Sequence, residues 1–361
     1  MKYDLVITWV NWSDKFFIKK LREAGHRGES CSNGNFIELK YLLRSLEKNN
    51  VNPRKIFIIH SDNHDPPSYL NEVDNLRFVK HSELVTDKKH LPFVQRQALW
   101  SYLHKIPDLT NLFFYMEDDY FILNRKIFDK LIDNYNNKTV FIDDRFFSRN
   151  YKLNEYLGLW YQSMINARNL TLNSKSNIYI TDNHWIKLLD KSILNEIENK
   201  YKKNFEITRN LKNKYTATKE QTTNVICTIS LFYNYLIHVK KFKYKYCKEL
   251  NVIELHTRCL SNETIKLLIK YISIFYIILS IFIKKKNNHL IYLISVFLIL
   301  ILSYIFPVIL TKEILRLSNS KWMLNAQGDG ISDEYKKCER VHKIFYSFIE
   351  KKFPKKSKYE K

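Results

Sequence analysis

Three consecutive acidic residues interrupt an apolar stretch of the chain. The segment "FFYMEDDYFIL" (113–123) has the aromatic and aliphatic residues of a buried strand, yet it contains Glu117, Asp118 and Asp119. Burying an unpaired carboxylate is costly, so such a strand usually ends where a cation is bound. Hard cations such as Mg²⁺ take oxygen ligands from one or two carboxylates and from substrate phosphates. Asp118 and Asp119 are therefore candidate metal ligands, and a solvated strand end is the alternative.

The surrounding pattern predicts which elements position these acids. Buried strands are expected at 3–10, 54–62, 76–84 and 111–123. Helices are expected between them, at 36–49 and 94–106. Alternating strands and helices indicate an α/β fold with a mostly parallel sheet and flanking helices. Ligands of such sheets bind at the carboxyl ends of the strands. Because Asp14 and Asp62 also follow predicted strands, they are expected at the same edge as the acids of 117–119, although single acids in loops are more often caps or turn residues.

Composition sets broad limits on function. The chain has 361 residues, 45% of them hydrophobic, with 6 Gly and 7 Pro, and these values favour a folded protein with a large core. The net charge of +22 favours anionic partners such as phosphorylated substrates or anionic lipid, although a genome-wide lysine bias would give the same excess. No nucleic-acid partner is expected, because the aromatic residues are not interleaved with basic runs.

Several functional classes lack their motifs. The five cysteines include no CxxC pair, so neither a zinc site nor a disulfide framework is indicated, which fits a reducing compartment. No signal peptide is expected, because "MKYDLVITWV" leads directly into a strand pattern. The sequence contains no GxxxxGK[ST], no GxSxG and no GxGxxG after a strand. Nucleotide hydrolases, dinucleotide enzymes and serine hydrolases therefore receive no support.

Two apolar runs separate the C-terminal part of the chain from the rest. Residues 267–283 and 290–310 flank the polar turn "KKKNNH", and the second run has no charged residue over 21 positions, enough to span a bilayer. We expect a membrane-associated helical hairpin, either crossing the bilayer or re-entrant. The predicted organisation is a catalytic α/β domain whose first part is 1–263, the hairpin at 264–316, and the C-terminal part of the catalytic domain at 317–361. An amphipathic helix is expected around Val341, Ile344, Phe345 and Phe348.

Four segments, taken together and in order, resemble the conserved regions of the Stealth proteins. "DLVITWVNWSD" resembles the first region, and "IELKYLLRSLEKNNVNPRKIFIIHSDNHDPPSYL" with "LPFVQRQALWSYLHKIPDLTNLFFYMEDDYFIL" resembles the second. "DNHWIKLLDKSILNEI" is similar to the third region, and "LNAQGDGISDEY" with "FPKKSKYE" to the fourth. The resemblance covers most of the chain except the apolar hairpin.

The resemblance implies a glycosyltransferase-A-like (Rossmann-like) core, with the hydrophobic hairpin inserted in it. It also implies transfer of a sugar 1-phosphate from a nucleotide-diphosphate sugar to a glycan hydroxyl, with a divalent metal, Mg²⁺ or Mn²⁺, as cofactor. Phosphoryl transfer needs positioning and charge neutralisation more than covalent catalysis, which suits an acidic metal-binding edge. The expected acceptor is a polysaccharide or glycolipid.

The resemblance also assigns roles to individual residues. His184 matches the third-region histidine and is the expected general base, since imidazole titrates near working pH. Asp119 and Asp14 are expected to join it in catalysis, with Asp118 and Asp119 holding the metal. Expected contacts to the substrate are Asp62, Arg44, Asn325 and Gln327.

The chain also departs from the family pattern. Asn11 and Trp12 replace the usual Asp and Gly, Lys40 replaces an Arg, and Glu117 stands where the family often has Asn. Thr216 occupies the place of an expected arginine, which removes one phosphate contact; Arg209 and Lys214 are the candidates to compensate.

The sequence thus predicts a capsular or cell-surface polysaccharide phosphotransferase. It is expected at the cytoplasmic face of a bacterial inner membrane, attached to membrane lipid through the hairpin. Two alternatives remain open: a metal-dependent glycosyltransferase that releases nucleoside diphosphate, and a non-catalytic membrane scaffold.

Overall fold

The computed structural model describes the protein in eleven segments. They are 2–11, 14–23, 38–71, 73–93, 95–142, 159–172, 185–212, 217–250, 252–256, 323–327 and 346–361. The expected hairpin at 264–316 lies outside these residues, so it and the predicted domain boundaries stay predictions. Within the described segments, no helix combines the length and apolar character needed to cross a membrane.

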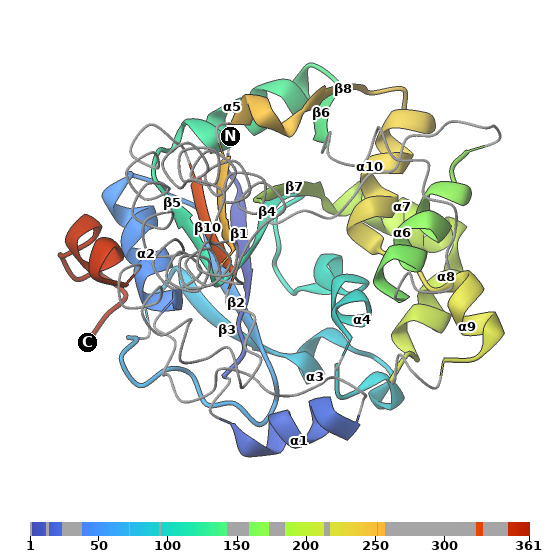
Figure 1. The fold of residues 1–361 in the computed structure, drawn as a ribbon, viewed down its shortest axis with the longest axis horizontal. Helices are drawn as coiled ribbons and strands as arrows, with labels where there is room; N and C mark the ends of the chain where they lie inside the picture. Colours follow the sequence, from blue (N-terminus) through green and yellow to red (C-terminus); the bar gives the residue numbers. More distant parts are fainter. Residues whose placement is uncertain are drawn as a thin grey trace, which may run out of the picture.

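A five-stranded sheet forms the centre of the fold, in the order β3-β2-β1-β4-β7 (Figure 1). Its strands are β1 (Asp4–Thr8), β2 (Ile56–His60), β3 (Leu76–Lys80), β4 (Leu112–Glu117) and β7 (Lys187–Asp190). The first four pair in parallel and β7 runs antiparallel to β4, which confirms the expected mostly parallel sheet. The carboxyl ends of β1, β2 and β4 therefore meet at one edge.

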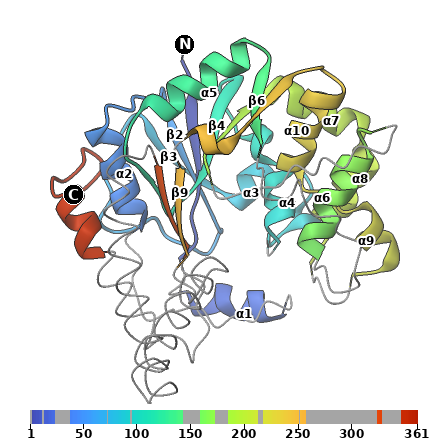
Figure 2. The ribbon, with the colours of Figure 1, turned by 45° about the horizontal axis from the view of Figure 1, so that its top comes forward.

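Both faces of this sheet are covered, because successive strand residues point to opposite sides. Val6, Phe57 and Phe113 pack into one hydrophobic core, whereas Leu5, Ile58 and Phe114 pack into the other. The helices are α1 (Lys15–Glu23), α2 (Glu38–Lys48), α3 (His81–Leu84), α4 (Arg96–Trp100), α5 (Lys126–Asn136), α6 (Leu159–Asn169), α7 (Lys191–Lys200), α8 (Lys202–Arg209), α9 (Lys219–Asn224) and α10 (Thr228–His238). Residues of α2 and α5 belong to the second core, and residues of α7, α8 and α10 to the first. Helices α6 to α10 gather at one end of the molecule (Figure 2).

Two smaller sheets flank the central one. The first has the order β5-β10-β9, with β5 (Tyr120–Ile122) antiparallel and β9 (Val252–His256) parallel to β10 (Met323–Gln327). The second joins β6 (Thr139–Ile142) and β8 (Lys243–Tyr246) in parallel. Three 3₁₀ turns complete the regular structure: Lys88–His90, Leu103–Lys105 and Cys247–Leu250.

Two predicted elements end earlier than expected. The expected strand 76–84 stops at Lys80, because Glu83 accepts a hydrogen bond from the Lys80 amide (2.8 Å) and starts α3. The expected helix 94–106 is split into α4 and a 3₁₀ turn. At this break the Ser101 hydroxyl bonds to the carbonyl of Ala98 (2.7 Å), a local bond that competes with helix continuation.

An ion pair fastens the amino-end edge of the central sheet. Asp4, fully buried at the start of β1, accepts two bonds from Arg54 (2.6 and 3.0 Å) and one from the Thr110 amide (2.8 Å). Arg54 precedes β2 and Thr110 precedes β4, so a single carboxylate links the entries of three strands. Because charged groups at this edge are satisfied by one another, it acts as a structural anchor.

The C-terminal segment 346–361 packs along α2, at the left of Figure 1. Its residues 346–352 are helical, in part of the region where an amphipathic helix was expected. Arg44 on α2 binds Glu360 through two bonds (2.6 and 2.7 Å) and the carbonyl of Phe353 (3.1 Å). The side chains of Arg44 and Glu360 are only 8% and 3% exposed, so this ion pair is desolvated.

Removing either partner of this pair leaves a buried charge without its counterion. We expect Arg44→Ala and Glu360→Ala each to lower the free energy of unfolding by about 3–5 kcal/mol, measured by chemical denaturation in detergent. Arg77→Ala is the control, because Arg77 and its partner Glu83 are both 37% exposed and such pairs contribute about 0–1 kcal/mol. A loss in Glu360→Ala no larger than in Arg77→Ala would contradict the structural role of the pair.

Candidate active site

The three acids of 117–119 lie at the junction of two sheets. Strand β4 ends at Glu117, Asp118 and Asp119 form a turn, and β5 begins at Tyr120 in the flanking sheet. The expectation that the acids end a strand at the carboxyl edge is confirmed. The expected single strand 111–123 is wrong, because the chain leaves the parallel sheet at the acids and pairs next with β10.

Electrostatic crowding dominates this turn. The pKa of Asp118 lies well above its usual range because protein surrounds the carboxyl and because Glu38 and Glu117 repel its charge; the Val10 amide, which favours the ionised form, offsets this only in part. The pKa of Asp119 is also raised, by burial and by the charges of Glu117 and Asp118, while Arg96 lowers it. A cation placed here would relieve this repulsion.

Glu38 is a member of this acidic group that the sequence did not single out. It is the first residue of α2, and burial raises its pKa to about 7 although the Tyr346 hydroxyl donates a hydrogen bond to it. An acid in the first turn of a helix ordinarily complements the helix dipole, so Glu38 carries no functional signal in the sequence. Only the fold brings Glu38 beside Asp118.

The donor set fits a divalent metal held partly by substrate. No group of three or more His, Cys, Asp or Glu side chains with metal-binding geometry occurs among the residues that the structure describes. Two adjacent carboxylates whose charges are poorly compensated match Mg²⁺, which retains waters and binds substrate phosphates. The residues present therefore suit a metal–diphosphate better than a closed protein cage.

Glu117 is held in place from the core side. Its carboxylate lies 3.4 Å from the hydroxyl of Tyr115 and 3.1 Å from the guanidinium of Arg96. The same Tyr115 hydroxyl accepts a bond from the indole of Trp100 (2.7 Å) and lies 3.1 Å from the hydroxyl of Thr8. This network fixes the end of β4 and the acids that follow.

Asp14 lies beyond the end of β1, in contact with a histidine. Its carboxylate accepts a bond from the Phe16 amide (2.7 Å) at the start of α1 and lies 3.1 Å from His64 Nε2. The other ring nitrogen of His64 accepts a bond from the Asn11 amide (3.4 Å), and burial lowers the His64 pKa. Asp14 and His64 thus hold the loop after β1, and a catalytic role for Asp14 stays a prediction.

Of the three expected substrate contacts Asp62, Asn325 and Gln327, the strand pairing places only Asn325 next to the acidic turn. Asp62 accepts a bond from the Ser82 amide (3.2 Å) and so joins the end of β2 to α3. On β10, Asn325 pairs with Tyr120, one residue after Asp119, whereas Gln327 pairs with His256 two positions further on. The backbone register therefore places Asn325 beside the acidic turn, and the substrate contacts of Asp62 and Gln327 stay predictions.

Two arginines considered as phosphate contacts have structural partners instead. Arg44 donates its hydrogen bonds to Glu360 and to the carbonyl of Phe353, so it anchors the C-terminal segment, and its expected substrate contact stays a prediction. Arg209 is buried, donates to the carbonyl of Ser101 (2.8 Å) and lies 2.7 Å from Glu198. It does not compensate for the arginine missing at position 216. Positions 214 and 216 lie outside the described residues.

His184 also lies outside the described residues, so its role stays a prediction. The structure describes the residues that follow it: Trp185 is buried, and β7 begins at Lys187, which pairs with Tyr115. Because β7 is antiparallel to β4, it starts at the carboxyl edge of β4, where the acids lie.

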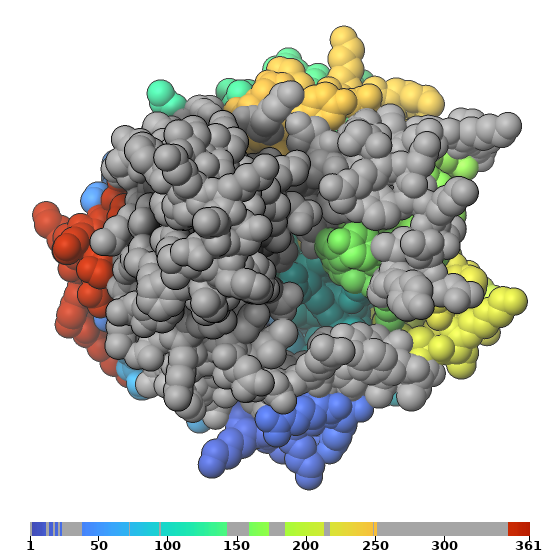
Figure 3. Space-filling view, in the orientation of Figure 1, coloured from blue at the N-terminus to red at the C-terminus, as the bar shows by residue number. Residues whose placement is uncertain are grey.

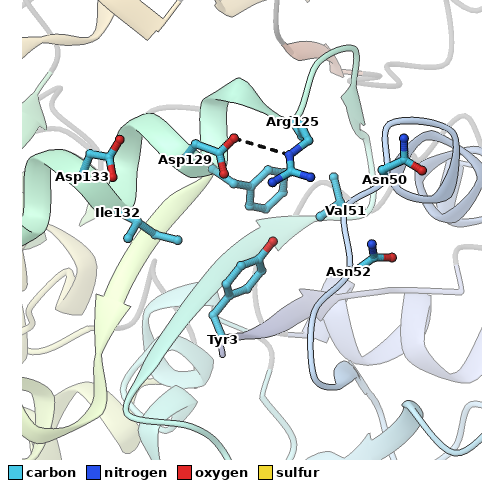
Figure 4. Close-up of a pocket in the computed structure, with 9 residues that line it drawn as sticks. Tyr3, Asn50, Val51, Asn52, Arg125, Asp129, Ile132 and Asp133 are labelled. Carbon is cyan, nitrogen blue, oxygen red and sulfur yellow. Dashed lines mark hydrogen bonds and ion pairs between the residues drawn. The ribbon is translucent and has the colours of Figure 1, made fainter. Parts of the chain in front are cut away.

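A pocket of ≈ 420 Å³ lies at the opposite, amino-end edge of the sheet (Figure 4). Tyr3 forms one side, Asn50 and Asn52 come from the loop before β2, and α5 contributes Arg125 and Asp129, whose side chains are 3.4 Å apart. Its position before β1 and β2 separates it from the acidic turn.

Comparison with solved structures finds only weak likeness. A galactosyltransferase LgtC in complex with donor and acceptor sugar analogues matches at a TM-score of 0.39 and 9% identity, covering 95% of both chains. An active-site mutant of LgtC matches at 0.41 and 10% identity. Similarity at this level supports no inference.

Sequence relatives are more informative. The capsular polysaccharide phosphotransferase LcbA of Aeromonas hydrophila is 33% identical over 129 residues, which are 33% of this chain and 35% of LcbA. The capsular polysaccharide phosphotransferase SacB of Neisseria meningitidis serogroup A is 36% identical over 126 residues, 33% of this chain and 22% of SacB. The match thus spans about a third or less of these relatives.

A family model matches the part of the chain that contains the acidic turn. Residues 33–141 match conserved region 2 of the Stealth proteins. This region includes α2, β2, β3, β4 and the acids of 117–119, which are the elements that build the candidate site. Over this region the chain is similar to the Stealth proteins.

Proposed function

We propose that this protein is a capsular or exopolysaccharide phosphotransferase that moves a sugar 1-phosphate from a nucleotide-diphosphate sugar to a glycan hydroxyl. One observation carries the proposal: the residues that match conserved region 2 of the Stealth proteins include the acidic turn. Sequence relatives of the chain are named polysaccharide phosphotransferases. Phosphoryl transfer requires charge stabilisation around the phosphates, and a metal-binding acidic edge provides it.

In the proposed reaction the acceptor hydroxyl attacks the phosphorus that carries the sugar. The bond from this phosphorus to the bridging oxygen breaks, a phosphodiester forms, and nucleoside monophosphate leaves with that oxygen. His184 accepts the hydroxyl proton, and Asp118 and Asp119 would hold the divalent metal, Mg²⁺ or Mn²⁺. The metal, when bound, supplies charge stabilisation for the phosphates and the leaving group.

The setting of this reaction is part of the proposal. The acceptor is a polysaccharide or glycolipid, and the enzyme works at the cytoplasmic face of the inner membrane, attached to lipid through residues 264–316. The support is the uncharged run of 21 residues and the net charge of +22, which favours anionic lipid. A hairpin there would keep the site beside membrane-bound glycan assembly.

The identity of the released nucleotide tests the reaction type. Detergent-purified protein, Mg²⁺, a panel of nucleotide sugars and a capsular oligosaccharide are combined, and the nucleotides are separated by chromatography. We expect nucleoside monophosphate that forms only when the acceptor is present. Release of nucleoside diphosphate would instead identify a glycosyltransferase.

Two substitutions separate an enzyme from a scaffold. We expect Asp119→Asn to lower the transfer rate on the order of 100-fold or more, because it removes a carboxylate that would hold the metal, and His184→Ala to lower it by a similar factor. Unchanged melting temperatures would show that both variants fold. If both keep the wild-type rate, the proposed roles of these residues are wrong.

The raised pKa values of Asp118 and Asp119 predict how metal binding depends on pH. Because these carboxyls retain protons above their usual range, Mg²⁺ must displace protons, and its affinity should rise with pH. A ligand that binds the folded state raises the melting temperature. We therefore expect about 10 mM Mg²⁺ to raise the melting temperature more at pH 8 than at pH 5.5. Asp119→Asn should remove most of this gain, and a gain independent of both pH and Asp119 would place the metal elsewhere.

A further inference from the structure

A half-exposed arginine faces the acidic turn from α4. Arg96 lies with its guanidinium 3.1 Å from the Glu117 carboxylate, and its charge lowers the pKa of Asp119. The Arg96 side chain is 49% exposed, whereas that of Glu117 is 12% exposed. Atoms of the α4 segment are visible at the floor of a hollow on one face of the molecule (Figure 3). A ligand can therefore reach Arg96 from solvent.

The guanidinium of Arg96 is held between a carboxylate and an aromatic ring. The guanidinium carbon lies 5.7 Å from the ring centre of Trp100, one turn further along α4, and Trp100 is fully buried. The Trp100 indole holds the Tyr115 hydroxyl that also reaches Glu117. Because Glu117 and the Trp100 ring are both anchored, Arg96 has a defined position beside the acidic turn, and its guanidinium carries five N–H groups.

Four other buried or partly buried cations have structural partners. Lys187, at the start of β7, is 1% exposed and donates to the carbonyl of Trp185 (2.6 Å). Arg44 and Arg209 make the structural contacts given above, and Arg54 lies at the amino-end edge with Asp4. Arg96, in contrast, contacts the acidic turn and is 49% exposed.

We propose that Arg96 is a binding residue for the diphosphate of the donor nucleotide sugar. The inference rests on the proposed function and adds a residue that sequence reasoning did not single out. A metal at Asp118 and Asp119 balances one part of the diphosphate charge, and a planar guanidinium matches phosphate oxygens through paired bonds. In this proposal the guanidinium of Arg96, beside Glu117 and exposed to solvent, donates hydrogen bonds to the phosphate oxygens.

Binding of inorganic pyrophosphate and uridine diphosphate, with Mg²⁺ and without acceptor, tests this role by calorimetry. We expect Arg96→Ala to weaken both ligands about tenfold or more, since hydrogen bonds to charged groups are among the stronger ones. Arg96→Lys should recover part of the loss, because charge returns without the paired geometry. Arg77→Ala removes an equal charge from an exposed pair and should leave binding within about twofold.

Kinetics and stability separate the possible outcomes. Where the donor is known, Arg96→Ala should raise the donor KM and leave the acceptor KM unchanged, with a melting temperature close to that of the wild type. Wild-type-like binding in Arg96→Ala overturns the inference alone. Failure of the wild-type protein to bind either ligand or to transfer phosphate would overturn the proposed function, and the assignment of Arg96 with it.

Discussion

Repulsion between neighbouring carboxylates is the constraint around which this site is organised. Glu117, Asp118 and Asp119 are adjacent in the chain, and Glu38 joins them from α2, so their charges cannot all be held in a partly dry site without compensation. Arg96 compensates one charge at the edge. The remaining imbalance, visible in the raised pKa values, is what makes the turn a suitable place for a divalent cation and a diphosphate.

The rest of the fold keeps these acids together despite the repulsion between their charges. The chain changes sheets at Asp118 and Asp119, so β4 fixes one end of the turn and β5, paired with β10, fixes the other. The Tyr115, Trp100 and Thr8 network holds Glu117, while the C-terminal segment holds α2 through Arg44 and supplies Tyr346 to Glu38. Repulsion of this kind is expected at functional sites, where residues needed for chemistry are kept although they reduce stability.

The sequence predicted what depends on local pattern and missed what depends on distant partners. Buried strands β1, β2 and β4 and the acids at the end of β4 follow from apolar runs and from the cost of burying carboxylates. The break between β4 and β5 did not, because "YFIL" has the same strand character as "FFYM" and only pairing with β10 separates them. The partner of Arg44 was not predicted because Glu360 is 316 positions away, and Glu38 was missed because its neighbours come from β4 and the C-terminal segment.

The most direct test of the account follows the phosphorus that bears the sugar. A nucleotide sugar carrying ³²P at this phosphorus is incubated with the protein, Mg²⁺ and a capsular acceptor, and the polymer is separated from free nucleotides. The account predicts that the label moves into the glycan, where it resists phosphatase and gives a phosphodiester signal in ³¹P NMR of unlabelled product. Label that remains in released nucleoside diphosphate, with sugar added to the glycan without phosphorus, would contradict it.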